Sequence, residues 1–211
     1  MSRRQREAVR AIEELGGRVQ YDDVIDDSGT FAPEKRQAPT CLTSVLGDRS
    51  TVRSAKLGDT QITDADLKYL ERLPELRVLD LGGGTLLKGP GLRYLEGLTE
   101  LRELCLSEVP VTDRGLACIR GLTRLRKLDL YYTRITDAGL IQIEGLGQLQ
   151  SLSLGCNDVT DKGISRLEGL TALQHLDLSS TKVTLAGVKT LQQKLPNCKI
   201  QSDLLSHSSE R

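Results

Sequence analysis

Residues 125–148, LRKLDLYYTRITDAGLIQIEGLGQ, hold one complete copy of a pattern that runs through most of the chain. Its leucines at 125, 128 and 130 form the frame LxxLxL. The frame recurs every 24 residues, with one step of 25, and its last leucine falls at positions 57, 81, 106, 130, 154 and 178. Degenerate copies stand at the two ends, at Val52/Ala55/Leu57 and Leu195/Cys198/Ile200. A fixed period of this length predicts a solenoid, in which each copy buries its leucines against the next.

The second half of each copy predicts a short helix. Apolar residues recur every third position in 116–125. A threonine followed by an aspartate suits a helix start, because the hydroxyl can accept from backbone N–H groups and the acid favours the positive helix end. The threonines concerned are Thr112, Thr136 and Thr160. A glycine can end a helix in the left-handed conformation, and we expect this at Gly97, Gly121, Gly145 and Gly169.

The combined pattern LxxLxLxxTxVTDxGLxxLxGLxxL resembles the leucine-rich repeats typical of bacterial, especially planctomycete, proteins, and it covers most of the chain. The resemblance implies an α/β fold: a leucine-rich repeat solenoid with a curved parallel sheet on the concave side, short helices on the convex side and an N-terminal cap. Threonine often replaces asparagine in this family, and an oxygen there can bond the backbone of the turn. The column so defined holds Thr60, Thr85, Thr133 and Thr181, and it is interrupted by Val109 and Asn157.

The pattern divides the chain into three regions. Residues 1–50 are expected to form an N-terminal helical cap and loop, 51–200 a solenoid of about six repeats, and 201–211 a flexible C-terminal tail. In the first region Val9, Ile12 and Leu15 mark a helix that Gly16 and Gly17 end. A strand at 18–21, a loop at 22–40 and a short helix at 40–48 follow. The alternative to a cap is a docking element that only a partner orders.

Composition removes several classes of function. The 29 basic and 29 acidic residues cancel, so a nucleic-acid partner is not expected. Five cysteines without a CxxC pair and two histidines predict neither a disulfide framework nor a metal site, and we expect no small-molecule cofactor. No apolar run is long enough to span a membrane. We therefore expect a cytoplasmic protein, membrane-anchored only if an anchor upstream of residue 1 is missing from this chain.

The predicted concave face also offers no clear catalytic site. The column before the last leucine of each frame reads Lys56, Asp80, Cys105, Asp129, Ser153, Asp177 and Lys199. Its aspartates alternate with other residues, so their attachment points lie ~10 Å apart, too far to share one calcium ion or to form a retaining glycosidase pair. His175 and Asp177 could form an acid–base couple, but no nucleophile motif accompanies them. Residues 82–85 (GGGT) lack the phosphate-loop pattern. We interpret them as a flexible stretch that accommodates the extra residue of the one 25-residue step. The sequence predicts a protein that is not an enzyme.

The remaining prediction is binding. The columns after the last leucine carry small or acidic residues, except for Tyr131 and Tyr132, and tyrosine is enriched at interface hot spots. We expect an unknown protein partner on the concave face, anchored by these tyrosines. Polarity and register would be set by Asp80, Glu103, Lys127, Asp129, His175 and Asp177. Tyr131 could instead only cover Gly155. Two other roles stay open: recognition of a cell-wall glycan if the chain is exported, and a structural assembly subunit.

Overall fold

The computed structural model describes residues 1–21, 51–84 and 86–206. These residues form one sheet of eight strands in the order of the sequence. The strands are β1 (Arg18–Tyr21), β2 (Val52–Lys56), β3 (Val78–Asp80), β4 (Glu103–Cys105), β5 (Lys127–Asp129), β6 (Ser151–Ser153), β7 (His175–Asp177) and β8 (Lys199–Gln201). Strands β2 to β8 are parallel, whereas β1 runs antiparallel to β2.

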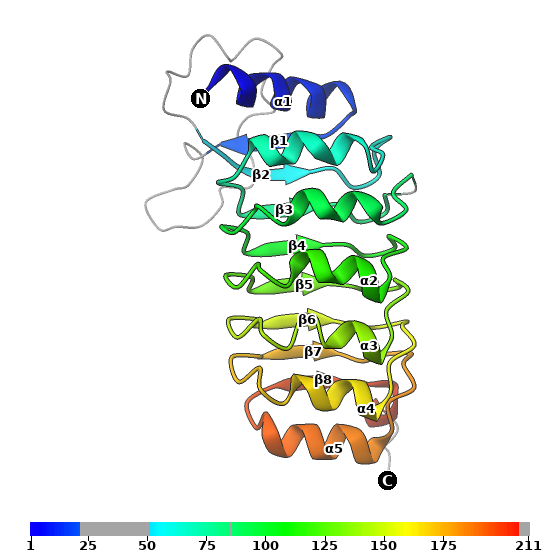
Figure 1. Ribbon diagram of the computed structural model, residues 1–211. Coiled ribbons are helices and arrows are strands. Elements are labelled where there is room, and N and C mark those ends of the chain that lie inside the picture. Colours follow the sequence, from blue (N-terminus) through cyan, green and yellow to red (C-terminus); the bar gives the residue numbers. More distant parts are fainter. Residues whose placement is uncertain (22–50, 85, 207–211) are drawn as a thin grey trace.

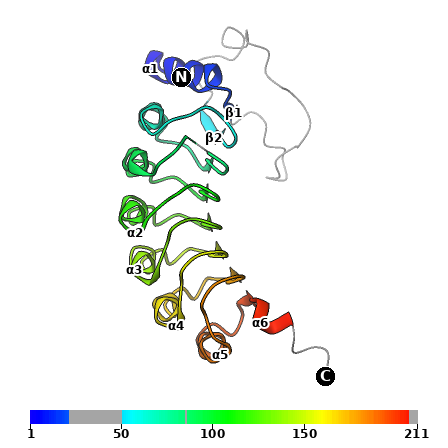
Figure 2. The ribbon, with the colours of Figure 1, turned by 90° about the vertical axis from the view of Figure 1, so that its right-hand side faces the viewer.

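Helices lie between the strands and at the two ends of the sheet, and those labelled η are 3-10 helices. They are α1 (Arg3–Glu14), η3 (Asp66–Arg72), η4 (Pro90–Leu95), α2 (Asp113–Leu116), η5 (Ala117–Ile119), α3 (Asp137–Leu140), α4 (Asp161–Ile164), η6 (Ser165–Leu167), α5 (Leu185–Lys194) and α6 (Asp203–Ser206). Strands and helices form two rows, with the helices on the outside of a gentle curve (Figures 1 and 2). The predicted solenoid, with its sheet on the concave side, is confirmed.

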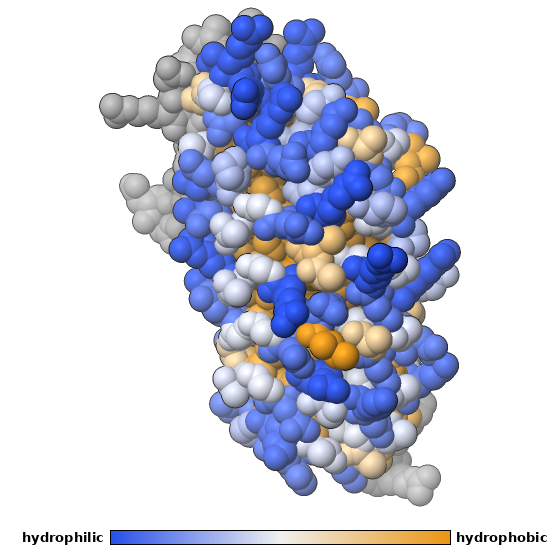
Figure 3. Space-filling model, in the orientation of Figure 1, coloured by the Kyte–Doolittle hydropathy of each residue, from blue (hydrophilic) through white to orange (hydrophobic). Residues whose placement is uncertain are grey.

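The leucine frame forms the core between the two rows. Leu125, Leu128 and Leu130 are each at most 2% exposed, and the equivalent residues of the other repeats are buried with them. Burial every third position suits 3-10 helices, in which residues i and i+3 lie directly above one another. The helix-bearing face outside this core is mainly hydrophilic, with smaller apolar areas between the charged residues (Figure 3).

The aspartate that follows each capping threonine bonds to the next repeat. The Asp113 carboxylate accepts from the N–H and the hydroxyl of Thr136 at 2.8 and 2.7 Å, and Asp137 accepts from Thr160 at 2.8 and 2.6 Å. Asp161 repeats this with Thr184. A Cβ on Gly163 would lie 2.2 Å from Asp137 Oδ1, so the glycine of the motif leaves room for the carboxylate.

The helix ends differ in part from the expectation. Thr136 and Thr160 accept from the N–H groups of Ala138 and Lys162, as N-caps do, but Thr112 makes no such bond. The prediction of left-handed glycines after the helices was wrong. None of the four is among the glycines with positive φ, which are Gly16, Gly83 and Gly89. The predicted positions were Gly97, Gly121, Gly145 and Gly169. The turns after these helices are therefore closed without a left-handed residue.

Two register assignments also need correction. Gly84, not Thr85, occupies the threonine column, because Gly84 N–H donates to Leu81 O at 3.2 Å as Val109 N–H does to Leu106 O at 3.1 Å. Thr85 lies outside the described residues.

At the other end of the solenoid, Lys199 pairs with His175, and Gln201 takes the predicted place of Lys199 beside Asp177. Ile200 pairs with Leu176, so the 24-residue step continues into β8, and the frame copy predicted at Leu195/Cys198/Ile200 was two residues out of register.

The N-terminal segment covers the first repeat. Helix α1 places Ala8, Val9 and Ile12 in buried positions, and it ends before Gly16, whose φ is +87°. Strand β1 then pairs with β2, as an edge that caps the solenoid would. The expected loop at 22–40 and helix at 40–48 lie outside the described residues. At the other end, β8 and α6 place regular structure in part of the stretch 201–206 for which the sequence predicts none.

Candidate partner-binding face

Strand alternation places two columns of side chains on the concave side of the sheet. The first column, in register across the strands, is Ser54, Val78, Glu103, Lys127, Ser151, His175 and Lys199. The second column is Lys56, Asp80, Cys105, Asp129, Ser153, Asp177 and Gln201. All six predicted polar site residues therefore lie in these columns.

The centre of this face is an open depression of about 400 Å³. It is lined by side chains of β2 to β6, including Asp80, Cys105 and Asp129. Lys127 Nζ and Glu103 Oε1 form an ion pair at 3.1 Å across its floor. Both side chains remain largely accessible, at 60% and 41%, so a partner can still contact them.

The three aspartates of the second column brace the turns that follow their strands. Asp80 Oδ1 accepts from Gly82 N–H at 3.0 Å, Asp129 Oδ1 from Tyr131 N–H at 2.9 Å, and Asp177 Oδ1 from Ser179 N–H at 2.9 Å. Each carboxylate thus holds the backbone two residues along the chain, as aspartate commonly does in turns. The sequence analysis did not predict that these aspartates stabilise turns. The spacings Asp-x-Gly at Asp80 and Asp-x-Ser at Asp177 could have indicated it.

Tyr131 lies over Gly155 of the next repeat. A Cβ on Gly155 would be 2.9 Å from Tyr131 Cδ2, so the ring occupies the space that a side chain would need. Cys156 Sγ lies within hydrogen-bond distance of Tyr131 Oη, at 3.2 Å. The pKa of Tyr131 is raised, with the hydrogen bond to and the charge of Cys156 as the main causes. The ring is nevertheless 39% exposed. Covering the glycine therefore leaves part of the tyrosine accessible from solvent.

Tyr132 projects further from the surface and is 64% exposed. Its φ is +50°, a left-handed conformation that side-chain-bearing residues rarely adopt. The same position is left-handed in other repeats, at Asp59, Gly83, Glu108, Cys156 and Ser180. The fold imposes this backbone, and only the fifth strand's turn places an aromatic ring on it. The two rings lie 6.4 Å apart with an interplanar angle of 36°.

The predicted site residues do not all gather at one point. Glu103 and Lys127 lie at the starts of β4 and β5, at the far end of the strands from the tyrosine pair, whereas Asp129 ends β5 beside Tyr131. Asp177 reaches the same place from β7, because its Oδ2 would be 3.1 Å from a Cβ on Gly155. Asp80 and His175 lie two strands from β5 on either side, about 10 Å away by the strand spacing.

Cys105 lies on this face and is bonded to its neighbours. Its sulfur is 3.2 Å from Ser107 Oγ and 3.8 Å from Asp129 Oδ2. Burial is the main cause that raises the pKa of Cys105, with Asp129 and Asp80 adding to it and Ser107 opposing it. The thiol therefore stays protonated at neutral pH.

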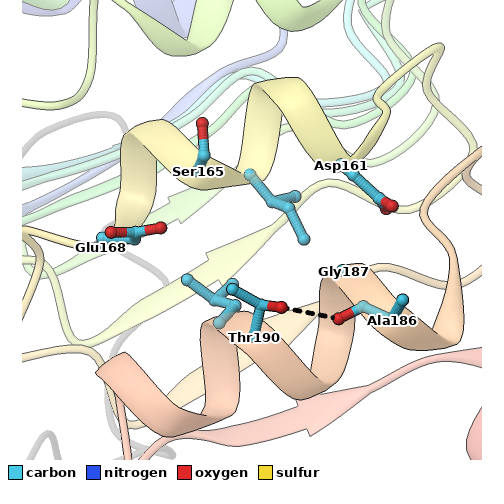
Figure 4. A pocket seen from close by; sticks show the side chains of 8 residues that line it. Asp161, Ser165, Glu168, Ala186, Gly187 and Thr190 are labelled. Carbon is cyan, nitrogen blue, oxygen red and sulfur yellow. Dashed lines mark hydrogen bonds between the residues drawn. The ribbon is translucent and has the colours of Figure 1, made fainter.

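A second hollow, of about 190 Å³, lies on the convex side between α4–η6 and α5. Asp161, Ser165 and Glu168 border it from one helical segment, and Ala186, Gly187 and Thr190 from the other (Figure 4). Thr190 Oγ1 donates to Ala186 O at 3.0 Å. Sequence reasoning did not identify this hollow.

Two features are absent from the described ranges 1–21, 51–84 and 86–206. No group of three or more His, Cys, Asp or Glu side chains in them has the geometry to hold a metal ion. No helix in them combines the length and apolar character needed to cross a membrane.

Comparisons with known proteins agree with this architecture. Residues 119–183 match the family model described as leucine rich repeat. Internalin C2 of Listeria monocytogenes str. 4b F2365 aligns with a TM-score of 0.58 and 23% identity, covering 71% of this chain and 70% of the internalin. Internalin F of the same organism aligns with a TM-score of 0.58 and 25% identity, and the match spans 71% of this chain but only 40% of that protein. A search of curated proteins found no match. The repeat match and the stacked parallel strands with short helices establish the fold of this chain as a leucine-rich repeat solenoid.

Proposed function

We propose that this chain is a non-enzymatic module that binds a protein partner through the concave face of the solenoid and the adjoining edge where the strands end. The observation that carries this proposal is the tyrosine pair. Two exposed rings rise side by side on a surface whose equivalent positions are Gly, Ser, Asp, Glu and Cys. Tyrosine provides a large rigid contact area at low entropic cost, and it is enriched at interface hot spots.

We assign different parts to the two tyrosines. Tyr132, 64% exposed and held outward by its left-handed backbone, is the principal anchor. Tyr131 supports it, because its ring is fixed over Gly155 and its phenol accepts from Cys156. A pre-positioned ring loses little freedom on binding, which favours affinity. The interpretation of Tyr131 as a cover for Gly155 and the interpretation as an anchor are thus compatible.

Polarity would come from charged groups beside the rings. Asp129 and Asp177 lie beside Tyr131, while Glu103, Lys127, Asp80 and His175 extend the surface across the concave sheet. Charges at an interface rim steer association and fix the register of the partner more than they add affinity. We therefore expect them to affect specificity and association rate.

The test is capture from a lysate of the native host, with three forms of the protein. The wild type, the Tyr131→Ala/Tyr132→Ala double variant and the Ile141→Ala variant are immobilised at equal density after their folding has been compared. Ile141 is an exposed apolar side chain that follows helix α3 on the convex side. A protein retained by the wild type and by Ile141→Ala, but lost with the double variant, is the expected result.

The same experiment separates the other roles. Retention of the same proteins by the double variant would contradict the tyrosine anchors. A glycan array with specific hits, abolished in the double variant, would replace the protein partner with a sugar. Light scattering that shows self-association at high concentration would indicate an assembly subunit. A planctomycete-type origin and a cytoplasmic location are further expectations of this proposal, with membrane anchoring only if a longer chain carries an anchor.

A further inference from the structure

Four arginines occupy equivalent places in four consecutive repeats. Backbone N–H groups join them directly: Arg77 donates to Arg53 O at 2.8 Å, Arg102 to Arg77 O at 2.7 Å, and Arg126 to Arg102 O at 2.7 Å. Because neighbouring strands lie ~4.8 Å apart, the four positions span about 14 Å along the solenoid. We call Arg53, Arg77, Arg102 and Arg126 the arginine column. It lies at the edge where β2 to β5 begin, on the left in Figure 1.

Neighbouring acids neutralise this column only in part. Arg53 Nη1 lies 3.3 Å from Glu75 Oε2 and also donates to Glu75 O. Glu100, the next acid along, forms its ion pair with Arg124. In the part of the chain that the structure describes, the guanidinium groups of Arg77, Arg102 and Arg126 make no hydrogen bond or ion pair. Positive charge therefore accumulates along the column.

The pKa of Arg102 and the hydrogen bonding of Arg77 both reflect the crowding of positive charge in the column. Burial, and then the charges of Arg77 and Arg126, lower the pKa of Arg102. Arg77 Nε is buried without a hydrogen-bond partner, and no other side-chain nitrogen or oxygen within residues 1–21, 51–84 and 86–206 is in that state. Buried donors in folded proteins nearly always have a partner. This nitrogen is itself buried, so an acceptor from another molecule would have to contact the rest of the Arg77 side chain, which is half-buried.

The column is separate from the tyrosine pair. Arg126 precedes β5, whereas Tyr131 and Tyr132 follow it. The two features therefore lie at opposite ends of the strands. The chain as a whole has 29 basic and 29 acidic residues, and the column is therefore a local excess of charge on a neutral protein. Local charge of one sign attracts a partner segment of the opposite sign.

We propose that the arginine column binds an extended acidic segment of a protein partner. A guanidinium group can donate two parallel hydrogen bonds to one carboxylate, which makes arginine well suited to such segments. Alternate side chains of an extended peptide point to the same side ~7 Å apart, so acids at positions i, i+2 and i+4 span about 14 Å. That length matches the column, and the segment runs along the solenoid axis, across the starts of the strands.

The test measures binding of a fluorescent peptide in which glutamate and serine alternate, with a glutamine–serine peptide as the uncharged control. The full chain is compared with Arg77→Gln/Arg102→Gln/Arg126→Gln. The matched control is Arg114→Gln/Arg120→Gln/Arg134→Gln, which removes the same charge from exposed positions outside the column. We expect the column variant to bind the acidic peptide at least about tenfold more weakly, and the control variant to bind within about twofold of the wild type. Affinity is also expected to fall as salt rises.

Further arms decide what occupies the column. Unchanged peptide binding by Tyr131→Ala/Tyr132→Ala would support an arginine column that binds independently of the tyrosine pair. This result does not depend on whether the concave face binds a partner. An equal loss in both arginine variants, or stronger binding of an oligonucleotide than of the peptide, would overturn the proposal. The chain also carries Asp22, Asp23, Asp26 and Asp27. If the wild type fails to bind and the variant with these four changed to Asn binds, the chain's own acids are the occupant and the partner claim is overturned.

Discussion

Asn157 closes the turns of two neighbouring repeats with one side chain. Its Nδ2 donates to Leu130 O at 2.6 Å, Leu154 O at 3.1 Å and Gly155 O at 3.2 Å. Its Oδ1 accepts from Thr133 Oγ1 at 2.7 Å and from Ile135 N–H at 3.2 Å. The residue is 6% exposed, so water cannot replace these bonds. The equivalent Thr181 makes a single bond, to Leu178 O at 2.7 Å.

Asn157→Ala is expected to lower the free energy of unfolding by about 2–4 kcal/mol, because several buried backbone groups lose their partner at once. Thr181→Ala removes one bond at a half-buried position and is expected to cost about 1 kcal/mol. Urea unfolding of the two variants measures both values. Equal losses would contradict the role assigned to Asn157.

The sequence located this column but misjudged its members. Threonine oxygens bonding the turn were expected, and Thr60, Thr133 and Thr181 do so. Asn157 appeared to interrupt the column, because its contacts come from a repeat 24 residues earlier and depend on how the repeats stack. The tyrosine pair was identified from its place in the repeat columns, whereas the exposure of each ring follows from its backbone and neighbours.

The Thr-Asp-x-Gly motif works between elements rather than within one. The sequence suggested that the aspartate serves the start of its own helix. In the structure Asp137 binds the N–H and hydroxyl of Thr160 in the next repeat, and Gly163 leaves space for it. A single repeat cannot show this, because the partner groups belong to the following copy. The motif therefore sets the spacing between stacked helices.

Two glycine substitutions separate this constraint from helix propensity. Gly163→Ala places a Cβ 2.2 Å from Asp137 Oδ1 and is expected to destabilise the fold by about 1–3 kcal/mol, as overpacking does. Gly169→Ala meets nothing within 4 Å and does not have a left-handed backbone, so stability is expected to stay unchanged or rise by up to about 1 kcal/mol. Thermal and urea unfolding measure the difference. A Gly163→Ala protein as stable as Gly169→Ala would show that the carboxylate is not held tightly.

For the whole molecule, the periodicity of the sequence predicted the architecture, whereas the net charge of the chain gave no indication of charged surface regions. The step of 24 residues indicated the stacked sheet, and the leucine frame indicated its core. The step holds into β8, where Ile200 pairs with Leu176, although the degenerate leucine frame had aligned Ile200 with Leu178. The strand at 18–21 was expected, but its antiparallel pairing with β2 follows no repeat and was not anticipated. A net charge of zero gave no sign of the arginine column, because charge placement depends on which residues the stacking brings together.

The most direct test of the concave binding face is the affinity of a purified partner for three folded proteins, measured by titration calorimetry. Hot-spot residues each contribute about 2 kcal/mol or more. The Tyr131→Ala/Tyr132→Ala variant is therefore expected to bind at least about 30-fold more weakly than the wild type. Ile141→Ala, which removes an exposed apolar side chain from the opposite face, is expected to bind as the wild type does. Wild-type affinity in the folded double variant would contradict the account.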